Sequence, residues 1–122
     1  MNGNSVILLD TNVVLYHLSK RLKEPLKSGR YAISSITELE LLSYPKISVV
    51  ELQKVQEFIE MATVIELKSS VKQNTITLRK KYSLKLPDAI IAGTALWLEL
   101  PLLTNDKKLL GITEITTHTV DI

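Results

Sequence analysis

Four acidic side chains stand where predicted strands and helices meet, and together they could hold a metal ion. Asp10 directly follows an apolar run at residues 6–9, and Asp106 follows another at residues 101–104. Asp88 heads an apolar helical stretch, and Glu40 lies early in a helix that follows a short strand. Carboxylates gathered at one place repel each other and raise each other's pKa, so their grouping needs a reason.

Hard divalent cations supply such a reason, because Mg²⁺ and Mn²⁺ prefer oxygen ligands. Two such ions, about 3.5–4 Å apart, can activate a water and stabilise a leaving oxygen in phosphodiester cleavage. The acidic set therefore predicts a cation site suited to phosphodiester hydrolysis.

Each acid also has a simpler explanation as a helix-capping residue. Asp10 could cap a helix at residues 13–18, Asp106 could cap one that ends near residue 110, and Asp88 suits a first helical turn.

Glu40 has two readings within its helix. It could form a capping box with Thr37, which would explain its presence without a metal. Ser35 and Glu38 offer the same box earlier in the chain and would leave Glu40 free to point elsewhere.

Alternating strands and helices must position these acids. Predicted strands span residues 5–9, 31–34, 63–67, 101–104 and, more weakly at an edge, 114–120. Predicted helices span residues 13–18, capped by Thr11 or Asn12, then 35 to before Pro45, 48–61, 69–82, 88–99 and 106–110. A basic turn at 20–23 could continue as helix over 25–28, ended by Gly29. This order predicts a single domain over residues 1–122, a three-layer α/β/α sandwich with a central, mainly parallel sheet. In such sheets, ligands bind at the carboxyl ends of the strands.

Composition narrows the class of protein. The 122 residues are 45% hydrophobic and 23% charged, with a net charge of +2 and no cysteine. The absence of cysteine excludes a disulfide framework and thiolate chemistry. No secretory or membrane-spanning segment is evident, so we expect a cytoplasmic protein without a membrane partner.

Four motifs in order resemble those of PIN-domain proteins, and specifically VapC-type toxin ribonucleases. They are D-T-N-V-V at 10–14, S-x-T-x-x-E-L at 35–41, D-x-x-I-A-x-x-A at 88–95 and T-x-[DN]-x-x-[FL] at 104–109. The second motif places the family's acidic ligand on Glu40, not on Glu38. The chain is short for the family, and Leu109 stands where the family often has Phe.

This resemblance implies a Mg²⁺- or Mn²⁺-dependent endoribonuclease that dimerises and is inhibited by a small antitoxin protein. It implies that Asp10, Glu40, Asp88 and Asp106 are the metal-binding and catalytic residues, with Asp10 and Asp106 holding the main ion. Thr11, Asn12 and Thr104 would orient these ligands or waters.

RNA affinity must come from basic residues around an acidic pocket. Lys107 and Lys108 are the best candidates because they adjoin Asp106; Lys20 and Arg21 are weaker candidates. Further basic residues are Lys23, Arg79, Lys80, Lys81 and Lys85. Trp97 and Tyr16 are read as core residues and not as base-stacking ones.

Other functions fit the sequence less well. A phosphoryl-accepting receiver domain would need an Asp at the end of the third strand, where Glu66-Leu67-Lys68 stands. A haloacid-dehalogenase-like phosphatase would need a second Asp where Asn12 stands. A non-toxin or catalytically silent PIN-domain binding module remains the alternative.

Overall fold

A parallel five-stranded sheet forms the centre of the protein, for which a computed structural model describes residues 5–122. The strands lie in the order β3-β2-β1-β4-β5, and every neighbouring pair is parallel. They are β1 (Val6–Leu9), β2 (Arg30–Ser34), β3 (Thr63–Ile65), β4 (Leu102–Leu103) and β5 (Thr117–His118). The predicted parallel sheet with an edge strand at the end of the chain is confirmed, although most strands are shorter than predicted.

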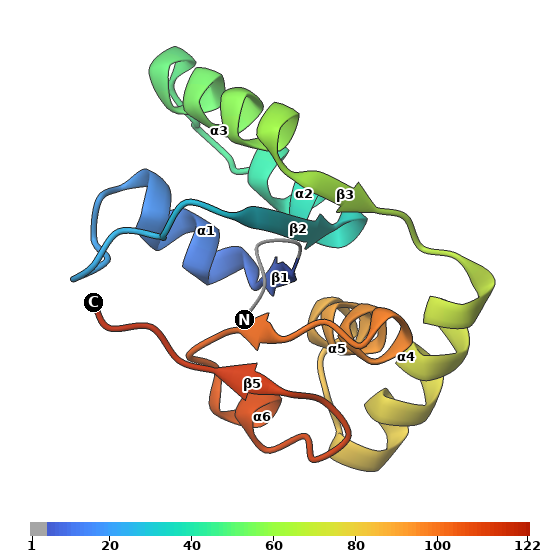
Figure 1. Ribbon diagram of the computed structural model, residues 1–122. Coiled ribbons are helices and arrows are strands. Elements are labelled where there is room, and N and C mark those ends of the chain that lie inside the picture. The colour runs from blue at the N-terminus through green and yellow to red at the C-terminus, as the bar shows by residue number, and fades with distance from the viewer. Residues whose placement is uncertain (1–4) are drawn as a thin grey trace.

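Within residues 5–122, six helices cover the two faces of the sheet (Figure 1). They are α1 (Thr11–Leu18), α2 (Ser35–Leu42), α3 (Val49–Met61), α4 (Ser69–Tyr82), α5 (Leu86–Leu98) and α6 (Lys107–Leu110). Leu8 of β1 packs in a core with residues of α4 and α5, whereas its neighbour Leu9 packs with residues of α1, α2 and α3. Because successive strand residues point to opposite faces, the sheet has a core on each side. The predicted α/β/α arrangement is therefore confirmed.

Three local predictions are wrong. Residues 25–28 form no helix: so short a helix needs its first N–H groups capped, as Asp106 caps the four-residue α6, and no side chain caps 25–28 within the described residues. The first helix begins at Thr11 with Asp10 as its N-cap residue, so neither Thr11 nor Asn12 caps it. Ser34, not Ser35, caps α2: its hydroxyl accepts a hydrogen bond from the backbone N–H of Ile36, and no capping box with Glu38 forms.

Helices α4 and α5 approach each other closely at Gly93. A Cβ atom at Gly93 would lie 2.8 Å from Thr75 Oγ1, 3.0 Å from the Thr75 nitrogen and 3.1 Å from the Val71 oxygen. The Asn74 side chain also donates to the Gly93 carbonyl across this contact. Glycine is therefore required here by the close helix packing, which fixes the position of α5 and of Asp88 in its first turn.

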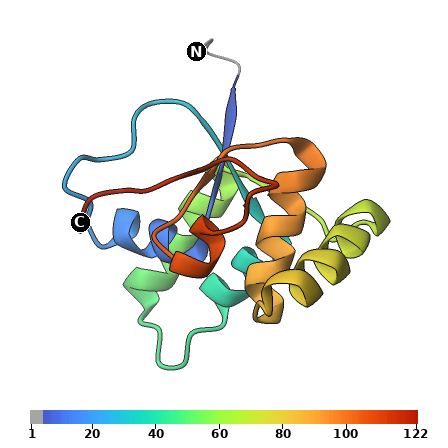
Figure 2. The same ribbon diagram turned by 90° about the horizontal axis from the view of Figure 1, so that it is seen from below.

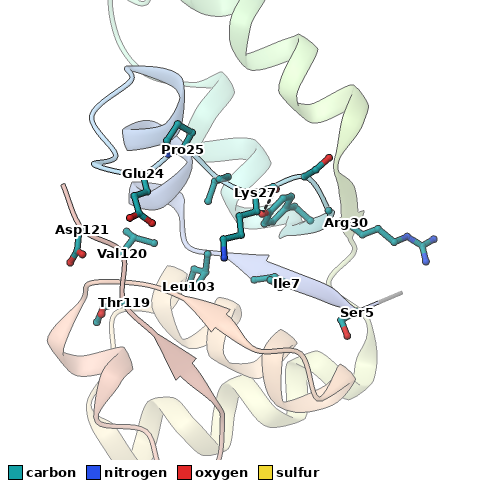
Figure 3. A pocket seen from close by; sticks show the side chains of 14 residues that line it. Ser5, Ile7, Glu24, Pro25, Lys27, Arg30, Leu103, Thr119, Val120 and Asp121 are labelled. Atoms are coloured by element: carbon teal, nitrogen blue, oxygen red, sulfur yellow. Dashed lines mark hydrogen bonds between the residues drawn. The ribbon is translucent and has the colours of Figure 1, made fainter. Parts of the chain in front are cut away.

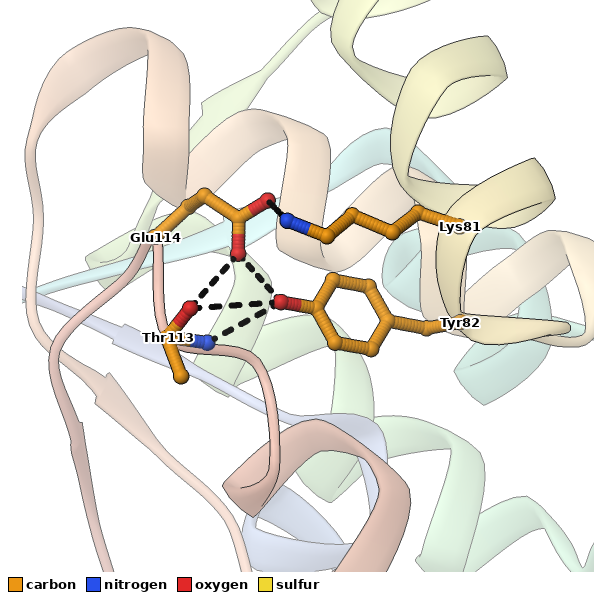
Figure 4. Close-up of polar contacts among 4 residues, drawn as sticks. All are labelled: Lys81, Tyr82, Thr113 and Glu114. Carbon is orange, nitrogen blue, oxygen red and sulfur yellow. Dashed lines mark hydrogen bonds and ion pairs between the residues drawn. The ribbon is translucent and has the colours of Figure 1, made fainter.

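A polar cluster ties the end of α4 to the loop after α6 (Figure 4). Lys81 Nζ lies 3.1 Å from Glu114 Oε2, and the Tyr82 hydroxyl donates to Glu114 Oε1. The Thr113 backbone N–H donates to the Tyr82 hydroxyl. These contacts lower the pKa of Glu114 to about 2, through the hydrogen bonds from Tyr82 and Lys81.

Within residues 5–122, none of the helices has the length and apolar character needed to cross a bilayer.

Candidate metal and catalytic site

Asp10 and Asp106 lie beside each other because β1 and β4 are neighbouring parallel strands. Leu9 pairs with Leu103, and the Asp10 backbone N–H donates to the Leu103 carbonyl at 3.1 Å. Each carboxylate follows the carboxyl end of its strand, Asp10 directly and Asp106 after two intervening residues. The chain thus brings together two acids that are 96 positions apart in sequence.

A buried hydroxyl joins these two segments. Thr104 Oγ1 donates to Asp10 Oδ2 at 2.7 Å and accepts from the Asp106 backbone N–H at 3.0 Å. Thr104 is fully buried and Asp10 is 5% exposed. The hydroxyl therefore fixes both the orientation of the Asp10 carboxylate and the turn that carries Asp106.

Glu40 is held by a second hydroxyl relay. Thr11 Oγ1 donates to Glu40 Oε1 at 2.7 Å and lies 2.9 Å from Thr37 Oγ1. Because Thr11 gives its proton to Glu40, Thr37 must donate to Thr11. Glu40 is therefore turned toward α1 and forms no capping box with Thr37. Sequence reasoning considered Thr37 only as a helix cap, and no local signal marked its contact with Thr11.

Asp106 does act as a helix cap, as the simpler reading proposed. Its Oδ1 accepts from the backbone N–H groups of Lys108 and Leu109, at 2.9 and 3.1 Å. A carboxylate has two oxygens with several acceptor positions, so capping through Oδ1 leaves Oδ2 available to another ligand.

Asp88 shows that the four acids share one electrostatic environment. Burial, the largest cause, and the charges of Asp106, Asp10 and Glu40, in that order, together raise the pKa of Asp88 to about 6. The nearby Lys85 opposes this shift. Burial likewise raises the pKa of Asp10, with further increases from Asp106 and Glu40, against the hydrogen bond from Thr104. The charges of Asp106 and Glu40 therefore lie close enough to Asp10 and Asp88 to oppose the ionisation of these two carboxyl groups.

The four carboxylates are of the type that binds a hard divalent cation, but they are not spaced closely enough to coordinate one without moving. All four side chains offer carboxylate oxygens, which Mg²⁺ and Mn²⁺ prefer. Among residues 5–122, however, no three acidic or histidine side chains lie close enough together to hold an ion as they stand. Asp10 and Glu40 each direct an oxygen at a threonine, and Asp106 directs one at backbone N–H groups. A bound ion would therefore require these side chains to reorient. The Asp88 carboxylate accepts no hydrogen bond within the described part of the chain.

The three polar residues predicted to orient the acids differ in the hydrogen bonds that they make. Asn12 is exposed and its side chain makes no hydrogen bond to the described residues, unlike Thr11 and Thr104. A different asparagine, Asn105, has a structural role near the site, although it was not among the residues predicted from sequence. Asn105 donates to the Val120 carbonyl and accepts from the Val120 N–H, both at 2.9 Å, and so anchors the turn before Asp106.

The basic candidates fall into two groups. Lys107 and Lys108 are exposed at the start of α6, and Lys108 Nζ donates to the Ser83 carbonyl at 3.2 Å. Lys20 and Arg21 follow the far end of α1, about 12 Å along the helix from its start beside Asp10. Lys85, which sequence analysis gave only as a further basic residue, lies close enough to Asp88 to lower its pKa.

A separate hollow of about 470 Å³ lies away from the acids (Figure 3). Its lining includes Ile7, Leu103 and Val120, together with the charged residues Lys27 and Arg30. The carbonyl of Asp121, another lining residue, accepts from the Lys23 backbone N–H. None of the four acids lines this hollow, so it is not part of the candidate site.

The protein thus combines a parallel sheet covered by helices with acidic residues that follow the carboxyl ends of β1 and β4. A family model described as PIN domain matches residues 7–114, so the chain belongs to the PIN domain family. The family resemblance carried by the four sequence motifs is confirmed.

Solved structures of toxin–antitoxin complexes contain chains with the same fold. A chain of VapBC2 from Rickettsia felis, bound to a DNA fragment from their promoter, gives a TM-score of 0.82 at 23% identity, covering 95% of this chain and 99% of that one. A chain of DNA-bound VapBC from Salmonella typhimurium gives 0.81 at 24% identity, covering 94% and 98%. A chain of a toxin–antitoxin complex from Klebsiella pneumoniae gives 0.73 at 30% identity, covering 91% and 96%. No curated protein matches the chain in sequence.

Proposed function

We propose that this PIN-domain protein is a metal-dependent endoribonuclease and the toxin of a toxin–antitoxin pair. The observation that carries the proposal is the grouping of Asp10, Asp106 and Glu40, held by Thr104 and Thr11, near Asp88. Their charges add to burial in raising the pKa of Asp88 to about 6. Neighbouring carboxylates do not stabilise a fold by themselves, because each negative charge repels the others. A divalent cation is the partner that would offset this repulsion.

The four carboxylates would hold Mg²⁺ or Mn²⁺. When bound, the cation would activate a water for in-line attack on an RNA phosphodiester and neutralise the departing oxygen. Thr104 keeps Asp10 facing the site, and the Thr37–Thr11 relay orients Glu40. Burial of these hydroxyls excludes water from the back of the site, so the carboxylates keep their positions between reaction cycles.

RNA would be held by the basic residues that border the acids. Lys85, Lys107 and Lys108 stand nearest, and Lys20 and Arg21 would meet a longer substrate along α1. Their contacts would be to phosphates, which position the RNA without reading its sequence.

The partner proteins follow from the comparisons. The similar chains come from VapBC and other toxin–antitoxin complexes, which supports a small antitoxin as the partner of this chain. We also propose a homodimer, as the sequence resemblance implies.

An RNA cleavage assay tests the function. Purified chain, free of any antitoxin, is incubated with a mixed RNA pool in Mg²⁺ or Mn²⁺, and then in EDTA. The Asp10→Asn variant is run beside it, with Asp121→Asn as a matched control at an exposed acid outside the site. Cleavage should require the metal, disappear with Asp10→Asn and persist with Asp121→Asn. Cleavage that persists with Asp10→Asn would contradict the assignment. A wild-type chain that neither cleaves RNA nor gains thermal stability from either metal would favour a silent binding module.

A further inference from the structure

The turn between α2 and α3 carries a tyrosine four residues after Glu40 and a lysine six residues after it. The Ile47 backbone N–H donates to the Tyr44 carbonyl at 3.4 Å, and Pro45 and Lys46 are the central residues of this turn. Lys46 has a φ of 62°, the left-handed conformation that the third position of a type II turn requires and that normally favours glycine. In Figure 2 the loop projects beyond the body of the protein, at the bottom of the view.

Tyr44 is an aromatic side chain with a free face. It is 40% exposed, and within residues 5–122 it makes no side-chain hydrogen bond and stacks on no ring or cation. Burial and, to a lesser degree, the charge of Glu40 raise the pKa of Tyr44, so the hydroxyl lies within electrostatic reach of the acidic site. A large exposed aromatic side chain next to a site for phosphodiesters is suited to stacking on a base.

A groove of about 490 Å³ continues from this tyrosine along α1. Its apolar lining includes Leu15, Leu18, Ile47 and Val55. Leu15 lies one helical turn, about 6 Å, beyond Thr11, which binds Glu40. None of the four acids lines the groove, which begins about one helical turn along α1 from the residue that binds Glu40.

Two lysines give the groove a cationic rim. Lys46 and Lys54 line it, and neither has a carboxylate within 4 Å, since Lys81–Glu114 is the one ion pair of the described residues. The third charged residue of the lining, Glu51, accepts from the Ser48 backbone N–H in a capping box at the start of α3. One acid already engaged by a helix N-terminus leaves the rim positive on balance.

We propose that Tyr44 and this groove bind an unpaired base of single-stranded RNA next to the phosphate at the acidic site, with Lys46 contacting the backbone. This inference rests on the proposed function and adds the side chains that would bind a base next to the cleaved phosphate. Proteins bind such RNA by stacking bases on aromatic side chains and lining the path of the backbone with cations. The groove offers both, whereas a purely apolar partner would leave Lys46 and Lys54 without a partner.

Binding of short RNAs tests the proposal. The probes are a fluorescein-labelled single-stranded RNA of about ten nucleotides and an abasic RNA of the same length, measured by fluorescence anisotropy with Ca²⁺ replacing Mg²⁺. Tyr44→Ala should weaken binding of the normal RNA about ten-fold and leave that of the abasic RNA within about two-fold. Tyr44→Phe should bind both RNAs like the wild type, because the ring and not the hydroxyl makes the contact.

The lysine is tested in the same assay. Lys46→Asn removes the charge and suits the turn, since asparagine tolerates positive φ. It should weaken both RNAs and lower the salt dependence by about one phosphate contact, while the control Lys72→Gln, an exposed lysine of α4, should change neither.

Several outcomes would overturn the inference. These are equal binding of the normal RNA by wild type and Tyr44→Ala, equal losses for the normal and abasic RNAs, or no RNA binding by the wild type. A Tyr44→Ala chain that binds RNA normally but loses a protein partner would also overturn it and assign the groove to that partner. Metal-dependent cleavage without a Tyr44 effect would contradict this inference alone. A base-dependent Tyr44 effect without cleavage would support the groove and contradict the nuclease.

Discussion

Replacing Asp88 with asparagine should stabilise the metal-free protein at neutral pH. The pKa of Asp88 is raised to about 6 from 3.8, through burial and the charges of Asp106, Asp10 and Glu40. A group whose pKa is raised on folding contributes its full stability below its unfolded pKa and loses it as the pH rises through the folded pKa. The wild-type protein should therefore lose stability between about pH 4 and pH 6, and asparagine, which does not titrate, should not.

The gain in the free energy of unfolding can be worked out from the shift in the Asp88 pKa. About 2 pKa units correspond to about 3 kcal/mol in full. Asp88 is only partly buried, so solvent screening reduces this to about 1–2 kcal/mol. The N-terminus of α5 favours the charge by about 0.3–1 kcal/mol, which leaves a net gain of about 1 kcal/mol for Asp88→Asn. For 122 residues this corresponds to a melting temperature about 4 °C higher.

Thermal unfolding followed by circular dichroism in EDTA, from pH 4 to pH 8, measures this difference. The two proteins should melt together near pH 4, diverge between about pH 4 and pH 6 and keep the full difference above pH 6, with Asp121→Asn as the control that follows the wild type throughout. Mg²⁺ or Mn²⁺ should narrow the difference, because the cation stabilises the wild-type carboxylate. An Asp88→Asn protein that is less stable than the wild type at pH 8 in EDTA would refute the electrostatic reasoning.

Three further substitutions test how the site is built. Gly93→Ala should destabilise the protein by about 1–3 kcal/mol in thermal unfolding, because its Cβ would crowd Thr75 and Val71; Gly111→Ala, whose Cβ has ordinary contacts of 3.5 Å or more, should be nearly neutral. Thr104→Val should weaken Mn²⁺ binding in calorimetry about 10–100-fold by releasing Asp10 and the Asp106 turn. The matched Thr94→Val, which removes a buried hydroxyl bonded only within α5, should leave Mn²⁺ affinity unchanged. Asn105→Ala should cost about 1–2 kcal/mol and speed hydrogen exchange of the Val120 amide, and unchanged exchange would show that the Asn105 bonds do not hold this segment.

The sequence predicted the sheet and the acidic edge because both have local signals. An apolar run that ends in a polar residue, as at Leu9 and Asp10, marks the end of a buried strand without knowledge of its partners. The boundary between Ser34 and Ser35 was harder, because two adjacent serines both suit a helix cap. Only the pairing of Ser34 with Ile65 in the sheet places the end of the strand.

The hydroxyl contacts of the site could not be predicted. Thr37 and Thr11 are 26 residues apart, and Thr104 and Asp10 are 94 apart. A threonine near a helix start is read from sequence as a cap, and only the tertiary fold shows which acid it orients. The same holds for Asn105, whose two bonds to Val120 depend on where the segment after β5 returns to the sheet.

Titration of the metal-free protein with Mn²⁺ in a calorimeter tests the central claim most directly. The wild type is compared with Asp10→Asn, Glu40→Gln, Asp88→Asn and Asp106→Asn, and with the control Asp121→Asn. Each of the four site variants should bind Mn²⁺ more weakly than the wild type, while Asp121→Asn should bind equally well. A wild-type protein without saturable Mn²⁺ binding, or four site variants that bind like the wild type, would contradict the account of one shared cation site.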